Sequence, residues 1–349
     1  MRNLTDTIGE SHIDRLGAMN GLAISYHDQG KFHEAAILYK QCIGIMKSCT
    51  PIDPHIYGVM NNLANTYTRQ EKYGDAETLH RECLEAAKCL EDNDSAICDS
   101  MNNLANTYTQ QTRYAEAETL YMQCLTYRKK VLGESHPQSL ESMNNLATCY
   151  QMQNKSNDAE KLYKQCLELR RTVLGENHNK TLETMNNLGN SYNELGKYYE
   201  AELLLNECLD KQKTFLGEND FALSNTIHTL ATTYYHQNKL AEANKLYRQS
   251  LDMRFSRSGE NPDTDHSMFM LAMTLDLQGE HAEAEELYKQ CLDNRRRSVG
   301  ESNTRTLDVL YLLAINYDHQ GKRSEAKAIR NEFKRLTNSR QHDSTCCNS

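Results

Sequence analysis

Cysteine and histidine have the greatest capacity for chemistry in this 349-residue chain. The sequence contains 12 cysteines and 13 histidines. A disulfide framework or a metal cluster needs such residues close together. Six cysteines instead recur at a long, fixed interval, with Ser250 in place of one more: Cys42, Cys83, Cys124, Cys166, Cys208 and Cys291. No Cys-x-x-Cys pair occurs. The spacing therefore predicts one buried, reduced thiol in each structural unit, used as a small apolar side chain, and no metal site.

No combination of residues predicts catalysis. The sequence has no Gly-rich phosphate-binding loop, no His-Glu-x-x-His motif and no Gly-x-Ser-x-Gly motif. Its histidines are scattered, and His12, His136 and His178 fall in loops, where we interpret them as loop structure and not as metal ligands or pH sensors. We therefore expect no catalytic residue, no cofactor and no enzyme activity.

One block of sequence repeats along the chain and sets its organisation. Met-Asn-Asn-Leu-Ala-Asn-Thr-Tyr stands unchanged at residues 60–67 and 101–108, and close copies stand at 143–150 and 185–192. Weaker copies begin at Met19, Ile227, Met268 and Leu310, so eight units follow one another at intervals of 41 or 42 residues. A period of this size indicates a repeat array.

Each unit has the pattern of two helices. In one unit the apolar and small residues fall at helical spacing, at Leu140, Met143, Leu146, Ala147 and Tyr150. A break at residues 153–156 precedes a second helical run, and in several units the break contains the Gly or Asn that suits a left-handed helix end. The prolines, at residues 51, 54, 137 and 262, all fall between units, as expected for a residue that disrupts helix interiors.

These patterns resemble the tetratricopeptide repeat. One unit carries every signature position, at Met101, Leu104, Ala105, Tyr108, Ala117, Tyr121 and Cys124. The resemblance implies an all-α, right-handed superhelical solenoid of about eight helix hairpins over residues 19–337. Residues 1–18 contain a copy of the unit ending and are expected to be the remnant of a preceding repeat or an N-terminal cap. Residues 338–349 are polar and are expected to form a disordered tail.

The units are longer than the usual tetratricopeptide unit and end in Leu-Gly-Glu, as at residues 132–134, 174–176 and 216–218. This form, with Asn-Asn-Leu-Ala in the first helix, resembles the kinesin light chain repeat, and nephrocystin-type proteins and several bacterial arrays share it. The resemblance implies a non-catalytic, cytoplasmic and cytoskeleton-associated module for microtubule-based transport. Its concave groove, lined by the first helices, would bind cargo, adaptor or motor-associated peptides or proteins. The alternative is a structural scaffold of the nephrocystin type that uses the convex face.

The groove that the resemblance implies is rich in asparagine. Its expected binding residues are Asn61, Asn65, Arg69, Asn102, Asn106, Asn144, Asn186, Asn190 and Asn193, followed in the later units by His228, Phe269 and Tyr311. Asparagine is a poor helix former, and its carboxamide can both donate to and accept from a peptide backbone. The alternative is hydrogen bonding between hairpins, above all by the second asparagine of each pair. Groove carboxylates such as Asp99, Asp276 and Asp318 disfavour an acidic peptide.

The overall charge and the ends of the sequence narrow the possible partners. With 39 basic and 48 acidic residues the net charge is −9, which argues against nucleic-acid binding. No apolar run is long enough to span a membrane and no secretory signal is present, so we expect no membrane insertion. The 18 residues before Met19 are too few for the heptad coiled coil that joins light chains to a motor. The ending Cys346–Ser349 fits a prenylation box poorly, and we expect no lipidation.

Overall fold

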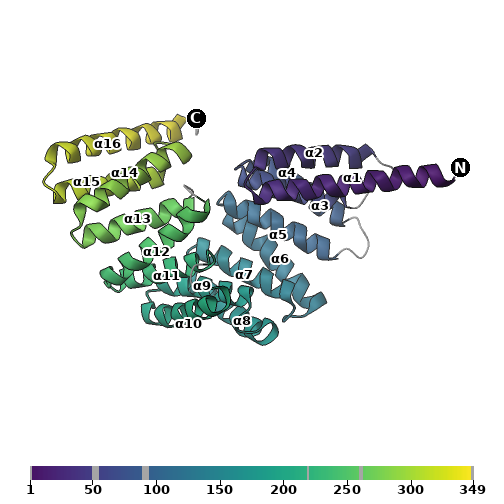
Figure 1. Cartoon of the computed structure of the whole chain (residues 1–349), viewed down its shortest axis with the longest axis horizontal. Helices are drawn as coiled ribbons and strands as arrows, with labels where there is room; N and C mark the ends of the chain where they lie inside the picture. Colours follow the sequence, from purple (N-terminus) through teal and green to yellow (C-terminus); the bar gives the residue numbers. More distant parts are fainter. Residues whose placement is uncertain (1, 49–54, 89–93, 218–219, 259–261, 347–349) are drawn as a thin grey trace. The chain divides into compact units, whose positions relative to one another are not determined.

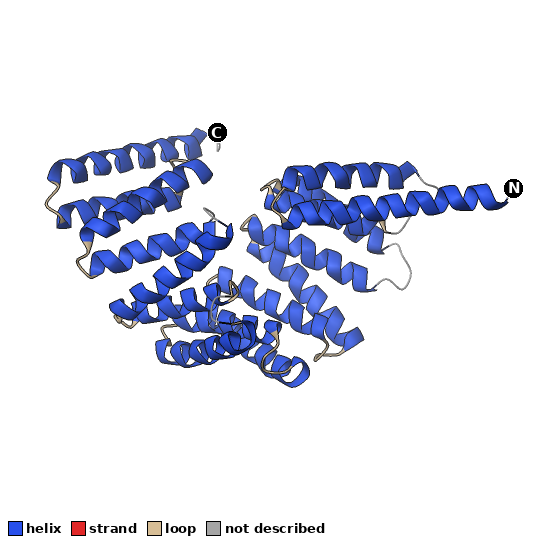
Figure 2. Cartoon of the chain, viewed as in Figure 1, coloured by secondary structure: helices blue, strands red, loops and turns tan. Residues whose placement is uncertain are grey.

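The computed structural model describes residues 2–48, 55–88, 94–217, 220–258 and 262–346, and every regular element in these ranges is an α-helix (Figure 2). The sixteen helices of the described residues form eight hairpins, so the predicted all-α repeat fold is confirmed (Figure 1). The chain divides into two compact units, residues 1–173 and 174–349.

The first unit contains four hairpins. Its helices are α1 (Arg2–Asp28), α2 (Phe32–Ser48), α3 (Ile56–Arg69), α4 (Tyr73–Lys88), α5 (Asp94–Gln110), α6 (Tyr114–Leu132), α7 (Pro137–Met152) and α8 (Ser156–Leu174). Helices adjacent in the chain pack against each other from α1 to α7.

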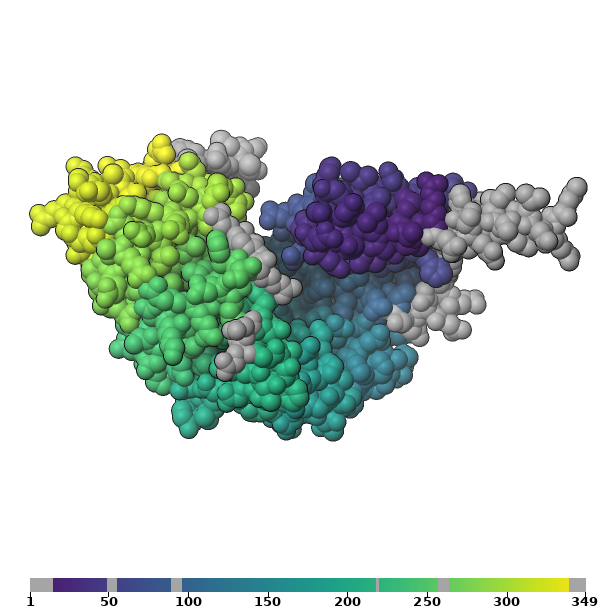
Figure 3. Space-filling model, in the orientation of Figure 1, coloured from purple at the N-terminus to yellow at the C-terminus, as the bar shows by residue number. Residues whose placement is uncertain are grey.

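The second unit contains the other four hairpins. Its helices are α9 (Asn179–Glu194), α10 (Tyr198–Leu216), α11 (Leu223–His236), α12 (Leu240–Ser258), α13 (Pro262–Leu277), α14 (His281–Ser298), α15 (Thr304–His319) and α16 (Arg323–Cys346). Helices adjacent in the chain pack against each other from α9 to α16. Figure 3 colours this unit from teal through green to yellow along the chain.

One left-handed residue closes every hairpin turn. These residues are Gly30, Glu71, Thr112, Asn154, Gly196, Asn238, Gly279 and Gly321, with φ between 58° and 86°. The next residue donates its N–H to a carbonyl five positions earlier, as Lys155 does to Tyr150 at 2.9 Å. This closure is the Schellman motif. The left-handed residue predicted at the break is therefore confirmed, although Glu71 and Thr112 adopt it without being Gly or Asn.

The cysteine rungs are buried, reduced thiols, as predicted. The thiols of Cys83, Cys124, Cys166, Cys208 and Cys291 each point at the carbonyl 26 residues earlier, in the first helix of the same hairpin. Cys166 contacts the Leu140 oxygen at 3.3 Å and Cys208 the Leu182 oxygen at 3.4 Å. Ser250 makes the same contact with Ser224 at 2.9 Å. Burial raises the pKa of Cys208 to about 12, so this thiol stays protonated and unreactive.

Two of the three predicted loop histidines begin helices, whereas the third, His12, lies within α1, so its assignment to a loop is wrong. His136 Nδ1 accepts the N–H of Gln138 at 3.3 Å, and His178 Nδ1 accepts that of Lys180 at 3.2 Å. Both are therefore helix N-caps, which agrees with their interpretation as loop structure. Pro137 and Pro262 occupy the first residue of α7 and α13, where the missing N–H removes no helical hydrogen bond.

The helices at the two ends run beyond the predicted repeat boundaries. Helix α1 begins at Arg2, so it includes most of residues 1–18. Helix α16 continues to Cys346, which corrects the prediction that a disordered tail starts at residue 338. The stretch from 338 to 346 contains no Pro or Gly, so nothing in its backbone interrupts the helical hydrogen bonds. Residues 347–349 lie outside the described residues.

Candidate peptide-binding surface

The first helices of neighbouring hairpins contact one another within each unit. Helix α3 touches α1 and α5 in the first unit, and α9 touches α11 and α13 touches α15 in the second. Residues four apart share a face of a helix. Asn65, Asn106 and Asn190 occupy the same position of α3, α5 and α9, and all three are exposed. We call the exposed side of these first helices the first-helix surface.

The asparagine one turn before each exposed asparagine is less accessible. Asn102 and Asn144 are 8% and 4% exposed, and Asn61 and Asn186 are half-buried. The Asn102 and Asn186 Oδ1 atoms are shielded from solvent and have no hydrogen-bond partner among the described residues. A ligand could reach these side chains only at their edges, whereas Asn65, Asn106 and Asn190 are open to contact.

Several polar side chains of the first helices are held by the second helix of their own hairpin. The Tyr121 hydroxyl donates to Asn106 Oδ1. Thr148 and Tyr163 share a hydrogen bond of 2.8 Å between their hydroxyls. In α4 a histidine replaces this tyrosine, and His80 Nδ1 donates to Asn61 Oδ1 at 3.1 Å. These bonds fix the carboxamide oxygens of Asn106 and Asn61 within a hairpin, and they do not join one hairpin to the next.

Asn193, in contrast, joins two hairpins. It is buried, its Nδ2 donates to the Thr229 carbonyl at 3.2 Å, and its Oδ1 accepts the Thr233 hydroxyl at 2.9 Å. Its carboxamide is therefore engaged between α9 and α11. Arg69 is exposed at the end of α3, with its guanidinium carbon 5.7 Å from the centre of the Phe32 ring.

The later first helices carry aromatic side chains at the corresponding positions. Tyr311 is 57% exposed, with its ring centre 6.2 Å from that of Phe333. Phe269 is half-buried, and the Arg295 guanidinium carbon lies 4.4 Å from its ring centre. His228 packs edge-on against Tyr247 at 5.3 Å. Burial, helped by the positive charge of Arg254 and by a neighbouring histidine, lowers the pKa of His228, so its imidazole stays neutral.

A row of buried arginines in the second helices was not predicted from the sequence. Arg128, Arg170, Arg254 and Arg295 recur at one repeat position, each at most 5% exposed, with Gln212 in the remaining unit between them. Arg128 pairs with Asp99 of its own hairpin and donates to Ser142 of the next at 2.7 Å. The negative charge of Asp99 is therefore balanced by the buried Arg128 guanidinium, which comes from the second helix of the same hairpin. The available signal was an arginine four residues after Cys124, Cys166, Ser250 and Cys291.

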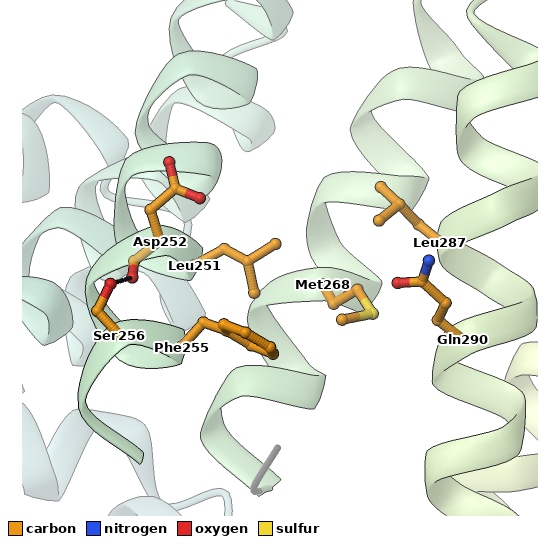
Figure 4. A pocket seen from close by; sticks show the side chains of 7 residues that line it. All are labelled: Leu251, Asp252, Phe255, Ser256, Met268, Leu287 and Gln290. Atoms are coloured by element: carbon orange, nitrogen blue, oxygen red, sulfur yellow. Dashed lines mark hydrogen bonds between the residues drawn. The ribbon is translucent and has the colours of Figure 1, made fainter. Parts of the chain in front are cut away.

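The second helices also expose apolar side chains. A hollow of about 380 Å³ lies between α12 and α14, lined by Leu251, Phe255, Met268 and Leu287 together with Asp252, Ser256 and Gln290 (Figure 4). Phe255 is 55% exposed at its edge. This hollow has apolar lining residues that the predicted alternative, a scaffold that binds through its outer face, could use.

The sequence matches the models of a known repeat family. Two family models, both described as tetratricopeptide repeat, match the chain: one over six overlapping segments between residues 56 and 332, the other over residues 15–48. None of the curated proteins matches the sequence. No helix in the described ranges is both long and apolar enough to cross a membrane.

Several solved structures share the fold. The nearly identical repeats of a kinesin light chain-like protein from Podospora anserina are 25% identical, with a TM-score of 0.51, covering 59% of this chain and 98% of theirs. BtubC from P. vanneervenii is 21% identical with a TM-score of 0.52, covering 71% and 94%. NprR in complex with its cognate peptide NprX is 17% identical with a TM-score of 0.57, covering 96% and 98%.

Proposed function

The chain belongs to the tetratricopeptide repeat family, and from this premise we propose that it binds an extended peptide of a cargo or adaptor protein along its first-helix surface. Repeats of this family form protein–protein interaction modules. The observation that carries the proposal is the recurrence of an exposed asparagine at one position of α3, α5 and α9. Exposed asparagine weakens a helix and buries no apolar area. In α5 the Asn106 Oδ1 atom supports the core through Tyr121, but this contact does not use the amide N–H₂ group.

The chemistry of these side chains suits a peptide backbone. The Oδ1 of Asn106 accepts the Tyr121 hydroxyl, which leaves the amide N–H₂ to donate to a ligand carbonyl. Such side chains read the main chain of an extended segment and place little demand on its sequence. Within the first unit we assign the polar contacts of a bound peptide to Asn61, Asn65, Asn102, Asn106 and Asn144. For a peptide bound to the second unit we assign them to Asn186 and Asn190.

A large apolar side chain of the ligand would bind to the later repeats. Tyr311 offers an exposed ring, and Phe269 offers a partly exposed one. Aromatic side chains provide most of the binding free energy in many interfaces because they bury a large area with little loss of conformational entropy. We therefore place the apolar anchor of the peptide on α13 and α15.

The names of the similar structures support this class of partner. One is described as a kinesin light chain-type repeat protein, and another was solved with a bound peptide. By analogy we propose a partner from cytoskeletal transport, engaged through a short linear segment in the cytoplasm. The asparagine row favours a segment recognised mainly through its backbone.

The experiment starts from peptides selected from a random library on the immobilised full chain, with affinities measured by fluorescence anisotropy. We expect the double variant Asn65→Ala/Asn106→Ala to weaken binding by about 1–3 kcal/mol, because each lost side chain removes a hydrogen bond. The single variant Asn65→Ala should keep its melting temperature, whereas Asn106→Ala should lower it modestly, because the buried Tyr121 hydroxyl loses this acceptor. The control is Asn157→Ala, an exposed asparagine of α8 that lies on a second helix. Unchanged affinity in the double variant would contradict the proposal.

The scaffold alternative rests on the hollow between α12 and α14. Phe255→Glu would place a charge at its exposed edge and should abolish an interaction made through the outer face. A partner that is lost in Phe255→Glu and retained in Asn65→Ala/Asn106→Ala would favour this second function.

A further inference from the structure

Three side chains able to hold a metal ion converge where the seventh and eighth hairpins meet. Asp276 lies near the end of α13, His281 is the first residue of α14, and His319 is the last of α15. Asp276 Oδ1 is 2.6 Å from His281 Nδ1 and 3.5 Å from His319 Nδ1. The three candidate ligand atoms all lie within 4.8 Å of one another.

We infer that Asp276, His281 and His319 form a binding site for a divalent transition-metal ion of the zinc type. Ligand atoms around a tetrahedral zinc ion, at about 2.0–2.1 Å from the metal, lie roughly 3.3 Å from one another. The two separations from Asp276 Oδ1 fall on either side of this value. Two imidazoles and one carboxylate favour zinc, nickel, copper or cobalt over magnesium and calcium, which prefer oxygen ligands. A fourth position remains for water or for a side chain of a bound partner.

Neighbouring groups hold two of the ligands in place. Asn316 is buried, and its Nδ2 donates to Asp276 Oδ1 at 2.8 Å and to the His281 carbonyl at 3.0 Å. Gln320 Nε2 also donates to the His281 carbonyl, at 3.2 Å. Such partners outside the ligand set orient the ligands and support metal affinity. The His319 side chain is 48% exposed, so an ion has access from solvent.

Metal binding requires one proton to move. In the metal-free site the His281 Nδ1–H donates to the Asp276 carboxylate, which can only accept when ionised. Coordination uses the Nδ1 lone pair, so the proton must leave Nδ1, for Nε2 or for solvent, when the ion binds. The charge of the ion is then partly balanced by Asp276.

An equivalent contact elsewhere in the same unit shows that packing alone does not require these residues. Asn193, Tyr198 and His236 occupy the repeat positions of Asp276, His281 and His319. There the Tyr198 and His236 rings stack at 5.2 Å, and Asn193 bonds to Thr233. Two hairpins thus meet through an amide, a phenol and one histidine. The change to a carboxylate and a second histidine at the later position supplies the ligand set.

The test is zinc titration of the full chain by isothermal calorimetry after treatment with a chelator. Every protein carries Cys346→Ser and Cys347→Ser, so that terminal thiols cannot bind the metal. We expect one zinc ion per chain and a higher melting temperature with zinc, since the ion joins α13, α14 and α15. Magnesium should produce neither effect. Asp276→Asn and His319→Ala should each weaken zinc binding at least about tenfold.

Two variants separate loss of zinc binding from loss of folding. Asp276→Asn restores the residue found at the equivalent contact, so this variant should fold with an unchanged helical circular dichroism spectrum. His236→Ala, at the repeat position of His319, is the matched control and should bind zinc as the parent does. Absence of zinc binding by the parent would overturn the inference, and so would affinity that is equal in Asp276→Asn, His319→Ala and the parent.

Discussion

At the scale of single residues, His80 occupies a core position at which several other repeats have a tyrosine. Other second helices place a tyrosine there, such as Tyr121 and Tyr163, whose hydroxyls bond to the first helix. His80 is fully buried, and its Nε2 has no hydrogen-bond partner among the described residues. Burial lowers the pKa of His80 to about 4. The folded protein therefore keeps this imidazole neutral where an unfolded chain would protonate it.

This histidine makes stability depend on pH. Its pKa is lower in the folded state than the ordinary 6.5, so the unfolded chain binds the extra proton between pH 6.5 and 4. The stability that is present above pH 6.5 is lost as the pH falls toward 4, by roughly 3 kcal/mol in total. We predict that His80→Tyr removes this part of the slope in urea unfolding measured between pH 7 and 4.5. The exposed His33→Tyr should keep it, and an unaltered slope in His80→Tyr would refute the assignment.

Thr112 stores backbone strain in a hairpin turn. Its φ is 60°, a left-handed conformation that is unfavourable for a β-branched residue, whereas four other turns use glycine. We predict that Thr112→Gly stabilises the chain by about 1 kcal/mol, because relief of this strain exceeds the entropic cost of glycine. Thermal unfolding measures the change. Gly196→Thr, at the same turn position, should shift the melting temperature in the opposite direction.

At the scale of helices and turns, a glutamate of one hairpin holds the turn of the next. Glu118 accepts from Gln153 and Lys155, both at 2.7 Å, and Glu285 accepts from Gln320 at 2.8 Å and Lys322 at 2.6 Å. Glu77 and Glu202 do the same in their hairpins. We call this arrangement the turn clamp. In these four places it fixes a hairpin against its predecessor at the end where the first helix stops.

The turn clamp between Glu285 and the turn joining α15 to α16 should make the stability of the protein sensitive to acid. Burial acts to raise the pKa of Glu285, but hydrogen bonds from Lys289, Lys322 and Gln320 outweigh it and hold the pKa at about 2. A carboxyl with a depressed folded-state pKa contributes stability above its unfolded value, near 4.3, and loses it as the pH falls toward 2. Glu285→Gln should therefore lower stability at pH 7 and flatten the decline below pH 4.5. Chemical unfolding of α15–α16, followed at several pH values, checks this.

The control for this experiment is Glu286→Gln, since Glu286 is exposed beside Glu285 on the same helix. Equal acid sensitivity of the two variants would show that the clamp does not contribute. Because the clamp joins two hairpins, the loss in Glu285→Gln should appear as earlier unfolding of the C-terminal hairpin.

The helix hairpins could be predicted from the sequence, but the contacts that join neighbouring hairpins could not. Periodicity located both helices of each unit and the left-handed turn, since each depends on residues close together in the chain. The clamp was not predictable, because Glu285 lies 35 residues from Gln320 and looks like any surface glutamate. The buried ion pair of Arg128 could not be predicted for the same reason, since its partners Asp99 and Ser142 belong to other helices. Burial of Asn102 and Asn193 likewise depends on packing between helices, which spacing does not reveal.

At the scale of the whole chain, stability depends on contacts between neighbouring hairpins. In the second unit the hairpin α13–α14 packs against α12 and α15, whereas, among the described helices, α15–α16 packs against the hairpin α13–α14. In such arrays the free energy is approximately a sum of repeat terms and nearest-neighbour terms. A hairpin with one neighbour should therefore open more often than a hairpin with two.

Hydrogen exchange can test this with two equivalent leucines. Leu271 of α13 and Leu313 of α15 occupy the same repeat position and are buried at 2% and 1% exposure. Truncation of each to alanine should cost about 2–5 kcal/mol. We predict that Leu313→Ala accelerates exchange mainly in α15–α16, because opening of an end hairpin leaves the others packed. Leu271→Ala should accelerate exchange in its own hairpin and in both neighbours, since it weakens two interfaces. Uniform acceleration across α11–α16 in both variants would indicate that this unit unfolds as a single cooperative block.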